Sequence, residues 1–106
     1  MRDFIQVTTT ASTKDQAAKI ATALLERRLA ACVQVVGPIE SHYWWNGKIE
    51  QSNEWLCIIK TIRERYPAVE STIRTNHSYE IPEIVACPIE GGSEPYLEWL
   101  RSETAE

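Results

Sequence analysis

The sequence feature that most constrains the fold is the dipeptide Asn46-Gly47, which interrupts a long segment of β-branched and aromatic residues. A type I′ turn needs positive φ at both central positions, and Asn-Gly tolerates this conformation better than other dipeptides. The segment 32–61 therefore predicts a long β-hairpin. Its predicted cross-strand pairs are Trp45 with Lys48, Tyr43 with Glu50, and His42 with Gln51.

A second signal divides this hairpin into two zones. Gly37-Pro38 predicts a bulge, because proline cannot donate a ladder hydrogen bond and glycine commonly marks irregular strand geometry. Below it, residues 32–36 and 55–59 are almost entirely apolar, which favours the centre of a sheet. Beyond it, residues 40–53 mix aromatic and charged side chains on both faces.

The segments around the hairpin predict helices and edge strands. Residues 4–10 are typical of a first strand, and residues 12–30 of a helix in which Thr13 and Gln16 form a capping box. After the hairpin we expect a second helix over 65–78 and a strand over 82–90. Pro88 predicts a bulge or a sheet edge in that strand. A short C-terminal helix is expected over 94–103, capped by Ser93 and with Tyr96, Trp99 and Leu100 on one side.

The order of these elements is β-α-β-β-α-β plus a terminal helix. This order predicts an α+β, ferredoxin-like sandwich with a long central hairpin. A chain of 106 residues is one domain by length, so we expect a single domain over 1–106.

Charge and motifs exclude several functions. A net charge of −4 argues against a nucleic-acid binder, and no apolar run approaches the ~18 residues of a membrane span. The N-terminal run has no secretory h-region, so we expect a cytoplasmic protein. Glycine-rich nucleotide motifs, a G-x-S-x-G elbow, H-E-x-x-H and C-x-x-C are all missing, which leaves no signature of an enzyme.

Three cysteines lie far apart, each inside an apolar run. Cys32, Cys57 and Cys87 are either buried thiols that act as small hydrophobic side chains or soft ligands for Cu(I). Ligation requires a second sulfur or an imidazole close by, and Cys32 and Cys57 lie on partner strands of the predicted hairpin.

The tip of the hairpin predicts self-association. It presents Tyr43, Trp44 and Trp45 beyond the reach of one small helical layer. Exposed aromatic clusters usually mark an interface. We therefore expect an oligomer whose sheets continue from subunit to subunit.

The stretch RTNHSYEIPEI, residues 74–84, collects ionisable side chains between a helix and a strand. His77 is either a metal ligand or proton carrier, or a helix C-terminal histidine that binds the last carbonyls. Tyr79, Glu80 and Glu83 are either solvated and packing residues or part of a polar cluster. Lys60 ends an apolar strand, where a lysine must pair with an acid or face a pocket between subunits, and we predict a cluster of Lys60 with Glu80 or Glu83.

Several of these motifs together resemble a known family. They are LAAC at residues 29–32, Tyr-Trp before the Asn-Gly turn with Gly-Lys-Ile-Glu after it, Lys-Thr at 60–61, H-x-Y-x-x-P-E-I at 77–84, and YLEWL at 96–100. In this combination the chain resembles the CutA family of divalent-cation tolerance proteins, from about Phe4 to Leu100.

The resemblance implies a ferredoxin-like homotrimer similar in architecture to the PII signalling proteins. It further implies a relation to copper or another divalent cation, with His77 and Cys32 as the metal ligands to test. Some bacterial relatives carry a cysteine in the first strand and a His-His pair, where this chain has Thr9 and Asn76.

Three hypotheses about function follow from the residues and the resemblance. The first is a trimeric cytoplasmic module that binds or senses a divalent metal. The second is a metabolite site or an enzyme between subunits, lined by Lys60, Tyr79, Glu80 and Glu83. The third is a structural scaffold for other proteins, held together through Tyr43, Trp44 and Trp45.

Overall fold

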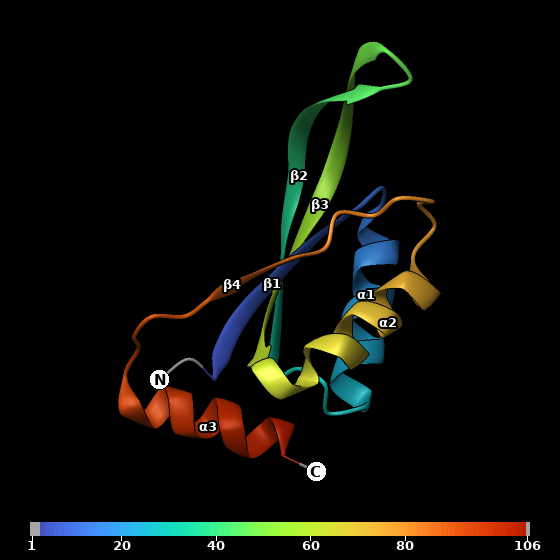
Figure 1. Ribbon diagram of the computed structural model, residues 1–106. Coiled ribbons are helices and arrows are strands. Elements are labelled where there is room, and N and C mark those ends of the chain that lie inside the picture. The colour runs from blue at the N-terminus through green and yellow to red at the C-terminus, as the bar shows by residue number, and fades with distance from the viewer. Residues whose placement is uncertain (1–2, 106) are drawn as a thin grey trace.

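The computed structural model describes residues 3–105 and has an α+β fold (Figure 1). Four antiparallel strands form one sheet in the order β2-β3-β1-β4. In chain order the elements are β1 (Phe4–Ala11), α1 (Lys14–Glu26), β2 (Cys32–Trp45), β3 (Lys48–Ile62), the short 3₁₀ helix η1 (Arg63–Arg65), α2 (Tyr66–Asn76), β4 (Val85–Pro88) and α3 (Glu94–Thr104). The predicted ferredoxin-like order is confirmed.

The main core lies between the sheet and the pair of helices α1 and α2. Successive strand residues point to opposite faces, so every second residue of β1 and β3 meets the helices. Figure 1 shows both helices on this side of the sheet. The buried cluster on this side contains Ile5, Val7, Ala11, Ala17, Ile20, Leu24, Ala30, Cys57, Ile59, Val69 and Ile73.

The other side of the sheet is mostly uncovered. Among the described elements α3 alone packs against it, at one end, where Phe4 and Ile62 join Leu97 and Leu100 in a second, smaller cluster. We call the remainder the open face. It is lined by Gln6, Thr8, Cys32, Gln34, Val36, Leu56, Ile58 and Lys60, which share one side by strand alternation and register.

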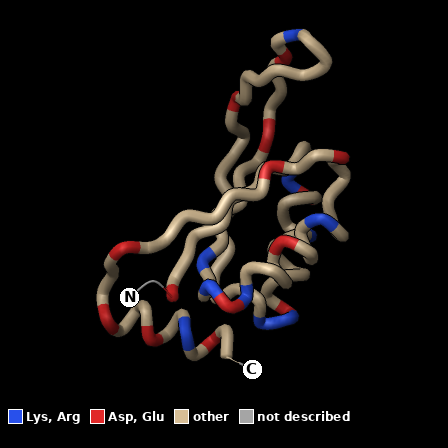
Figure 2. Tube along the Cα trace, viewed as in Figure 1, with Lys and Arg blue, Asp and Glu red and all other residues tan. Residues whose placement is uncertain are grey.

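The hairpin follows the predicted register. All three expected pairs form, and Asn46 and Gly47 have φ values of 51° and 77°, as a type I′ turn requires. The register shifts between Val36 and Ile39, which confirms the predicted bulge. Beyond the bulge, residues 39–54 project from the sheet as an arm. Its tip carries Lys48, and acidic residues follow along both strands (Figure 2).

The first helix begins and ends through local hydrogen bonds. Thr13 Oγ1 accepts the Gln16 N–H at 3.0 Å, but the Gln16 side chain binds the Asn76 carbonyl instead of closing the predicted capping box. The helix ends at Glu26, earlier than predicted. There Arg28 has a φ of 58°, and the Arg28 and Leu29 N–H groups bind the Leu25 and Leu24 carbonyls in a Schellman motif.

Three other expectations about elements were wrong. Strand β2 is an edge strand and not central, so Val35 and Val36 are 39% and 47% exposed. Strand β4 spans only Val85–Pro88, because proline cannot donate to a ladder and only β1 pairs with this strand. In α3 the buried residues are Leu97, Leu100 and Thr104, whereas Tyr96 and Trp99 are exposed and Ser93 makes no side-chain cap.

Candidate functional site

The loop between α2 and β4 is held by His77, which lies directly after the last residue of α2. His77 Nε2 lies 2.6 Å from the Thr10 carbonyl oxygen, and His77 Nδ1 accepts the Tyr79 N–H at 3.1 Å. Because a carbonyl can only accept, this pattern assigns the ring proton to Nε2. Both ring nitrogens are therefore occupied by backbone groups.

Tyr79 connects this loop to the base of the arm. Its hydroxyl donates a 2.7 Å hydrogen bond to Glu54 Oε2, and Glu54 is only 7% exposed. Burial, followed by the hydrogen bond to Glu54, raises the pKa of Tyr79 above its ordinary value. The phenol therefore stays protonated at neutral pH and acts as a donor that fixes the carboxylate.

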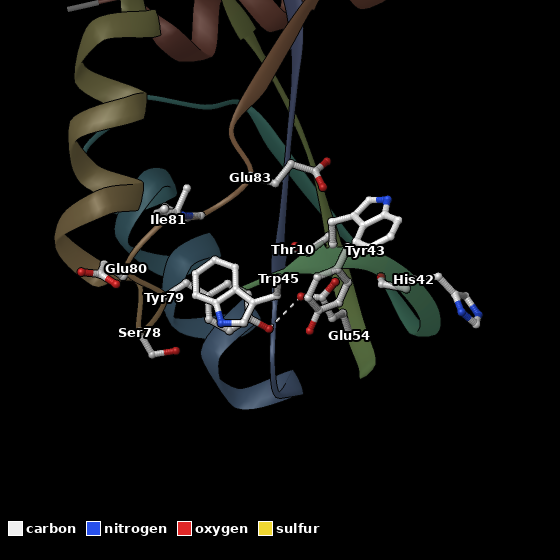
Figure 3. A pocket seen from close by; sticks show the side chains of 13 residues that line it. Thr10, His42, Tyr43, Trp45, Glu54, Ser78, Tyr79, Glu80, Ile81 and Glu83 are labelled. Carbon is white, nitrogen blue, oxygen red and sulfur yellow. Dashed lines mark hydrogen bonds between the residues drawn. The ribbon is translucent and has the colours of Figure 1, made fainter. Parts of the chain in front are cut away.

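A cavity of about 800 Å³ lies between the arm and this loop (Figure 3). We call it the arm cavity. It is lined by Thr10, Glu54, arm residues 41–45 and loop residues 78–83. In Figure 3 the side chains of His42 and Glu80 point away from the other labelled residues, while Tyr79 and Glu54 meet through their hydrogen bond.

The structure brings some of the predicted site residues together and separates others. Tyr79, Glu80 and Glu83 all line the arm cavity. Lys60 does not line it; this residue lies on the open face opposite Cys32, and its Nζ donates to Gln34 Oε1 at 2.6 Å. The predicted pairing of Lys60 with Glu80 or Glu83 is therefore not made within one chain.

Glu54 and Thr10 are among the cavity residues that were not predicted. Glu54 is the last charged residue before the apolar run of β3, so a buried carboxylate at the start of that run was a usable signal. Thr10 contributes its backbone carbonyl to His77 from 67 residues away along the chain. No local pattern reveals such a contact.

The thiols differ from one another in their surroundings. Cys57 is buried, and burial raises its pKa from 9.0 to about 11, so it remains a thiol at neutral pH. Cys87 is exposed on β4 and Cys32 is half-buried, so the expectation of three buried thiols holds only for Cys57. Cys32 and Cys57 are not cross-strand partners, because Cys57 pairs with Val35 and Cys32 pairs with Lys60, three positions along the ladder.

Metal-ligating side chains do not converge within one chain. Over residues 3–105 no group of three or more His, Cys, Asp or Glu residues is placed to hold an ion. His77 has both nitrogens engaged, so ligation by this residue requires the loss of a backbone hydrogen bond. In the same range, none of the helices has the length and apolar character that crossing a bilayer requires.

Comparison with known sequences gives a consistent result. The family described as CutA1 divalent ion tolerance protein matches residues 5–103. The divalent-cation tolerance protein CutA of Archaeoglobus fulgidus is 43% identical over 106 residues, which are 100% of both chains. The chloroplastic protein CutA 1 of Oryza sativa is 42% identical over 96% of this chain.

Not all relatives have the same length as this chain. The chain spans 58% of the rice protein and 49% of the human protein CutA, to which it is 47% identical over 83% of its own residues. It therefore covers about half the length of such relatives.

Solved structures agree with the sequence comparison. CutA1 from Oryza sativa superposes with a TM-score of 0.95 at 41% identity, covering 98% of this chain and 95% of that one. The Thermus thermophilus divalent cation tolerance protein gives 0.94 at 39% identity, with coverages of 96% and 99%. The family match, the identities and these superpositions show that the chain belongs to the CutA family of divalent-cation tolerance proteins.

Proposed function

We propose that this chain forms a homotrimeric cytoplasmic module of divalent-cation tolerance that binds a metal ion, copper first among them, or a small ligand between its subunits. The observation that carries the proposal is the open face together with the arm. Val36 is 47% exposed, Val85 48% and Trp44 72%, and the described part of the chain offers them no cover. Apolar exposure of this extent is typical of an interface.

The two sheet edges are suited to such an assembly. Strands β2 and β4 form the edges and run antiparallel to each other, since each step across the sheet reverses direction. Copies related by a rotation can therefore join edge to edge in antiparallel pairing. Closure of a ring removes free edges, which otherwise favour aggregation.

Ligand binding between subunits fits the positions of the predicted site residues. Lys60 and Cys32 lie on the open face, and His77, Tyr79, Glu80 and Glu83 lie at the loop. A neighbouring copy is needed to bring members of the two groups together. The metal form of the proposal therefore places its ligands on two subunits.

Calorimetry tests direct metal binding. Reduced, purified protein is titrated with Cu(II), Zn(II) and, without oxygen, Cu(I). Saturable binding that is lost when the trimer is dissociated supports the proposal. Failure of every ion to bind more tightly than millimolar contradicts a role as a metal-binding protein.

A second candidate is a small-metabolite site, and the arm cavity favours it. Its volume of about 800 Å³ lies within the range of ligand pockets. A thermal-shift screen of nucleotides, amino acids and organic acids without metal tests it, because a ligand that binds only the folded state raises the unfolding temperature. We expect binding without turnover and assign no catalytic residue. A purely structural scaffold is the outcome if neither metals nor small molecules bind.

A further inference from the structure

The arm cavity has an unusual chemical composition. Its lining carries three glutamates, four aromatic residues and no lysine or arginine. Its single histidine, His42, is paired with Glu40 at 2.9 Å and points away from the other labelled side chains (Figure 3). The glutamates are Glu54, Glu80 and Glu83, and the aromatic residues are Tyr43, Trp44, Trp45 and Tyr79.

Glu54 presents an acceptor to this cavity. It is more than nine-tenths buried, and Tyr79 donates to its Oε2. Within residues 3–105 this is the one side-chain hydrogen bond that Glu54 makes, and it leaves Oε1 as the second acceptor of the carboxylate. Glu54 lines the cavity, so its carboxylate is the buried acceptor offered to a ligand there. A carboxylate removed from bulk water strongly favours a cationic donor.

The aromatic residues add a second attraction for positive charge. Tyr43 and Trp45 belong to the arm that we expect near a subunit boundary, and within one chain they are 41% and 43% exposed, so a ligand held between the arm and the loop can contact their rings. An ammonium group near the face of a tryptophan or tyrosine is attracted by the ring quadrupole. Tyr79 donates a hydroxyl hydrogen bond to Glu54 and brings no positive charge to it.

The size of the arm cavity and the spacing of its acids favour an organic cation over a metal ion. The cavity measures about 800 Å³, far more than one ion fills. In the described chain the acids do not gather into a group of three around one point. Glu80 points away from the other labelled residues, which leaves Glu54 and Glu83 as separate carboxylates beside the aromatic rings, an arrangement that suits an elongated cation.

We infer that the arm cavity binds a small organic cation with a primary ammonium group, which donates to Glu54 Oε1 and lies against the rings of Tyr43 and Trp45. The inference deepens the small-ligand form of the proposed function and rests on it. The ammonium can belong to a free diamine or to a lysine side chain.

Calorimetric titration of the intact protein with four probes tests this inference. Cadaverine represents a free diamine, Nα-acetyl-lysine amide a lysine side chain, tetramethylammonium a cation without N–H donors, and glutarate an anion of similar length. We expect saturable binding of cadaverine or of the lysine amide, weaker binding of tetramethylammonium and none of glutarate. The tighter of the two amines identifies the source of the ammonium.

Variants locate the bound ammonium. Glu54→Gln retains an acceptor for Tyr79 but removes the charge, and we expect amine affinity to fall by about tenfold or more. Trp45→Leu weakens binding of all cations through loss of the ring. Glu98→Gln removes one exposed charge on α3, away from the cavity, and is the matched control that leaves affinity unchanged.

Three results overturn the inference: no saturable binding of either amine at millimolar concentration, equal binding of glutarate, or equal losses in Glu54→Gln and Glu98→Gln. Light scattering on the same samples reports the oligomeric state independently. A trimer that does not bind either amine contradicts only this inference, whereas a stable monomer contradicts the proposed assembly.

Discussion

At the residue scale, the contacts of His77 and Tyr79 explain how a loop with several polar residues is fixed. The imidazole binds the Thr10 carbonyl and the Tyr79 N–H, and the two rings lie 4.7 Å apart. Tyr79 then reaches Glu54 on β3. The loop is thus attached to β1 and β3 through two adjacent polar side chains.

Replacement of Tyr79 by phenylalanine tests the value of this attachment. The change leaves Glu54, a buried carboxylate, without its donor, so we expect a loss of about 1–3 kcal/mol in the free energy of unfolding. Tyr43→Phe is the control, because its hydroxyl binds Ser52 at an exposed position and its loss has little effect. Urea unfolding at one fixed protein concentration compares the two, and equal midpoints contradict the prediction.

Alkaline pH tests the same hydroxyl. The pKa of Tyr79 is raised from 10.0, so the folded chain keeps a proton that the unfolded chain loses above about pH 10. Stability contributed by the protonated phenol is complete below pH 10 and decreases as pH rises further. Burial also raises the pKa of Tyr66 and Tyr96, and that of Cys57 to about 11, so all variants lose stability there.

The test of this pH dependence is therefore a difference between proteins. The range from about pH 9.5 to 11 includes the ordinary tyrosine pKa near 10. Over this range we expect Tyr79→Phe to lose less stability than the unchanged chain, because it has one titrating phenol fewer. Chemical denaturation across this range measures it. Parallel curves for the two proteins contradict the assignment of the shift to Tyr79.

The sequence alone identified the polar loop but not the partners of its residues. The H-x-Y-x-x-P-E-I motif is local, so Tyr79, Glu80 and Glu83 were recognisable as neighbours. Glu54 and Thr10 reach the loop only through folding of the sheet. Within one chain Lys60 donates to Gln34, so its predicted pairing with Glu80 or Glu83 stays a prediction for the contact between subunits.

At the element scale, the two helix starts form a natural comparison. Thr13 accepts a hydrogen bond from Gln16 N at the start of α1, whereas Ser93 makes no side-chain bond at the start of α3. We expect Thr13→Ala to reduce stability by about 1 kcal/mol and Ser93→Ala to have little effect. Thermal and urea unfolding measure both, and a larger effect of Ser93→Ala contradicts the capping assignment.

The bulge in β2 depends on a close approach between strands. A Cβ atom added at Gly37 lies 2.7 Å from Trp55 Cγ, so the ring or the backbone must move. We expect Gly37→Ala to cost about 1–3 kcal/mol. Gly91→Ala is the control, because a Cβ there meets nothing within 4 Å. Similar midpoints for the two variants contradict the tight packing of Trp55.

Features set by local sequence signals were predictable, whereas features set by the order of strands in the sheet were not. The Asn46-Gly47 turn fixes the register of the hairpin within a few residues, so the cross-strand pairs followed from the sequence. The edge position of β2 depends on strand order, which a single segment does not encode. The apolar run of β2 is typical of a central strand, but in one chain Val35 and Val36 remain exposed.

At the scale of the whole molecule, the elongated shape reflects an arm without a core of its own. The chain measures 44 × 26 × 22 Å, and the arm extends beyond the helical layer (Figure 1). A two-stranded ribbon is marginally stable alone. The arm therefore gains most from contact with another copy.

A pair of exposed apolar residues tests the proposed trimer. Val36 on the open face is 47% exposed, and Leu25 on α1 is 42% exposed. We expect Val36→Glu to convert a trimer into smaller species, because it buries a charge in the interface, and Leu25→Glu to leave the trimer intact. Light scattering at micromolar concentration measures the mass. A monomeric unchanged protein, or equal effects of both variants, contradicts the proposed interface.

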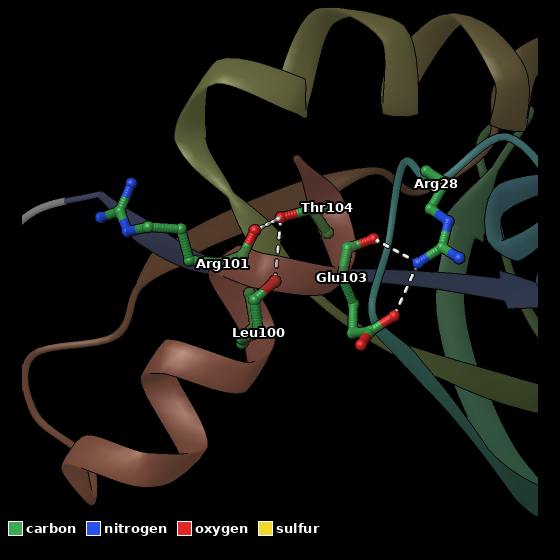
Figure 4. Close-up of polar contacts among 5 residues, drawn as sticks. All are labelled: Arg28, Leu100, Arg101, Glu103 and Thr104. Carbon is green, nitrogen blue, oxygen red and sulfur yellow. Dashed lines mark hydrogen bonds and ion pairs between the residues drawn. The ribbon is translucent and has the colours of Figure 1, made fainter. Parts of the chain in front are cut away.

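The division of the interior into two unequal clusters has a consequence for motion. In the described chain a small buried cluster holds α3 to the sheet, together with the hydrogen bond from Arg65 Nε to the Thr104 carbonyl. The exposed ion pairs of Arg28 with Glu103 and Arg101 with Asp3 add to it (Figure 4 shows the first). Exposed pairs contribute little to stability. Helix α3 should therefore open as a separate unit at a lower free energy than β1 and β3, and its amide hydrogens should exchange with deuterium before theirs.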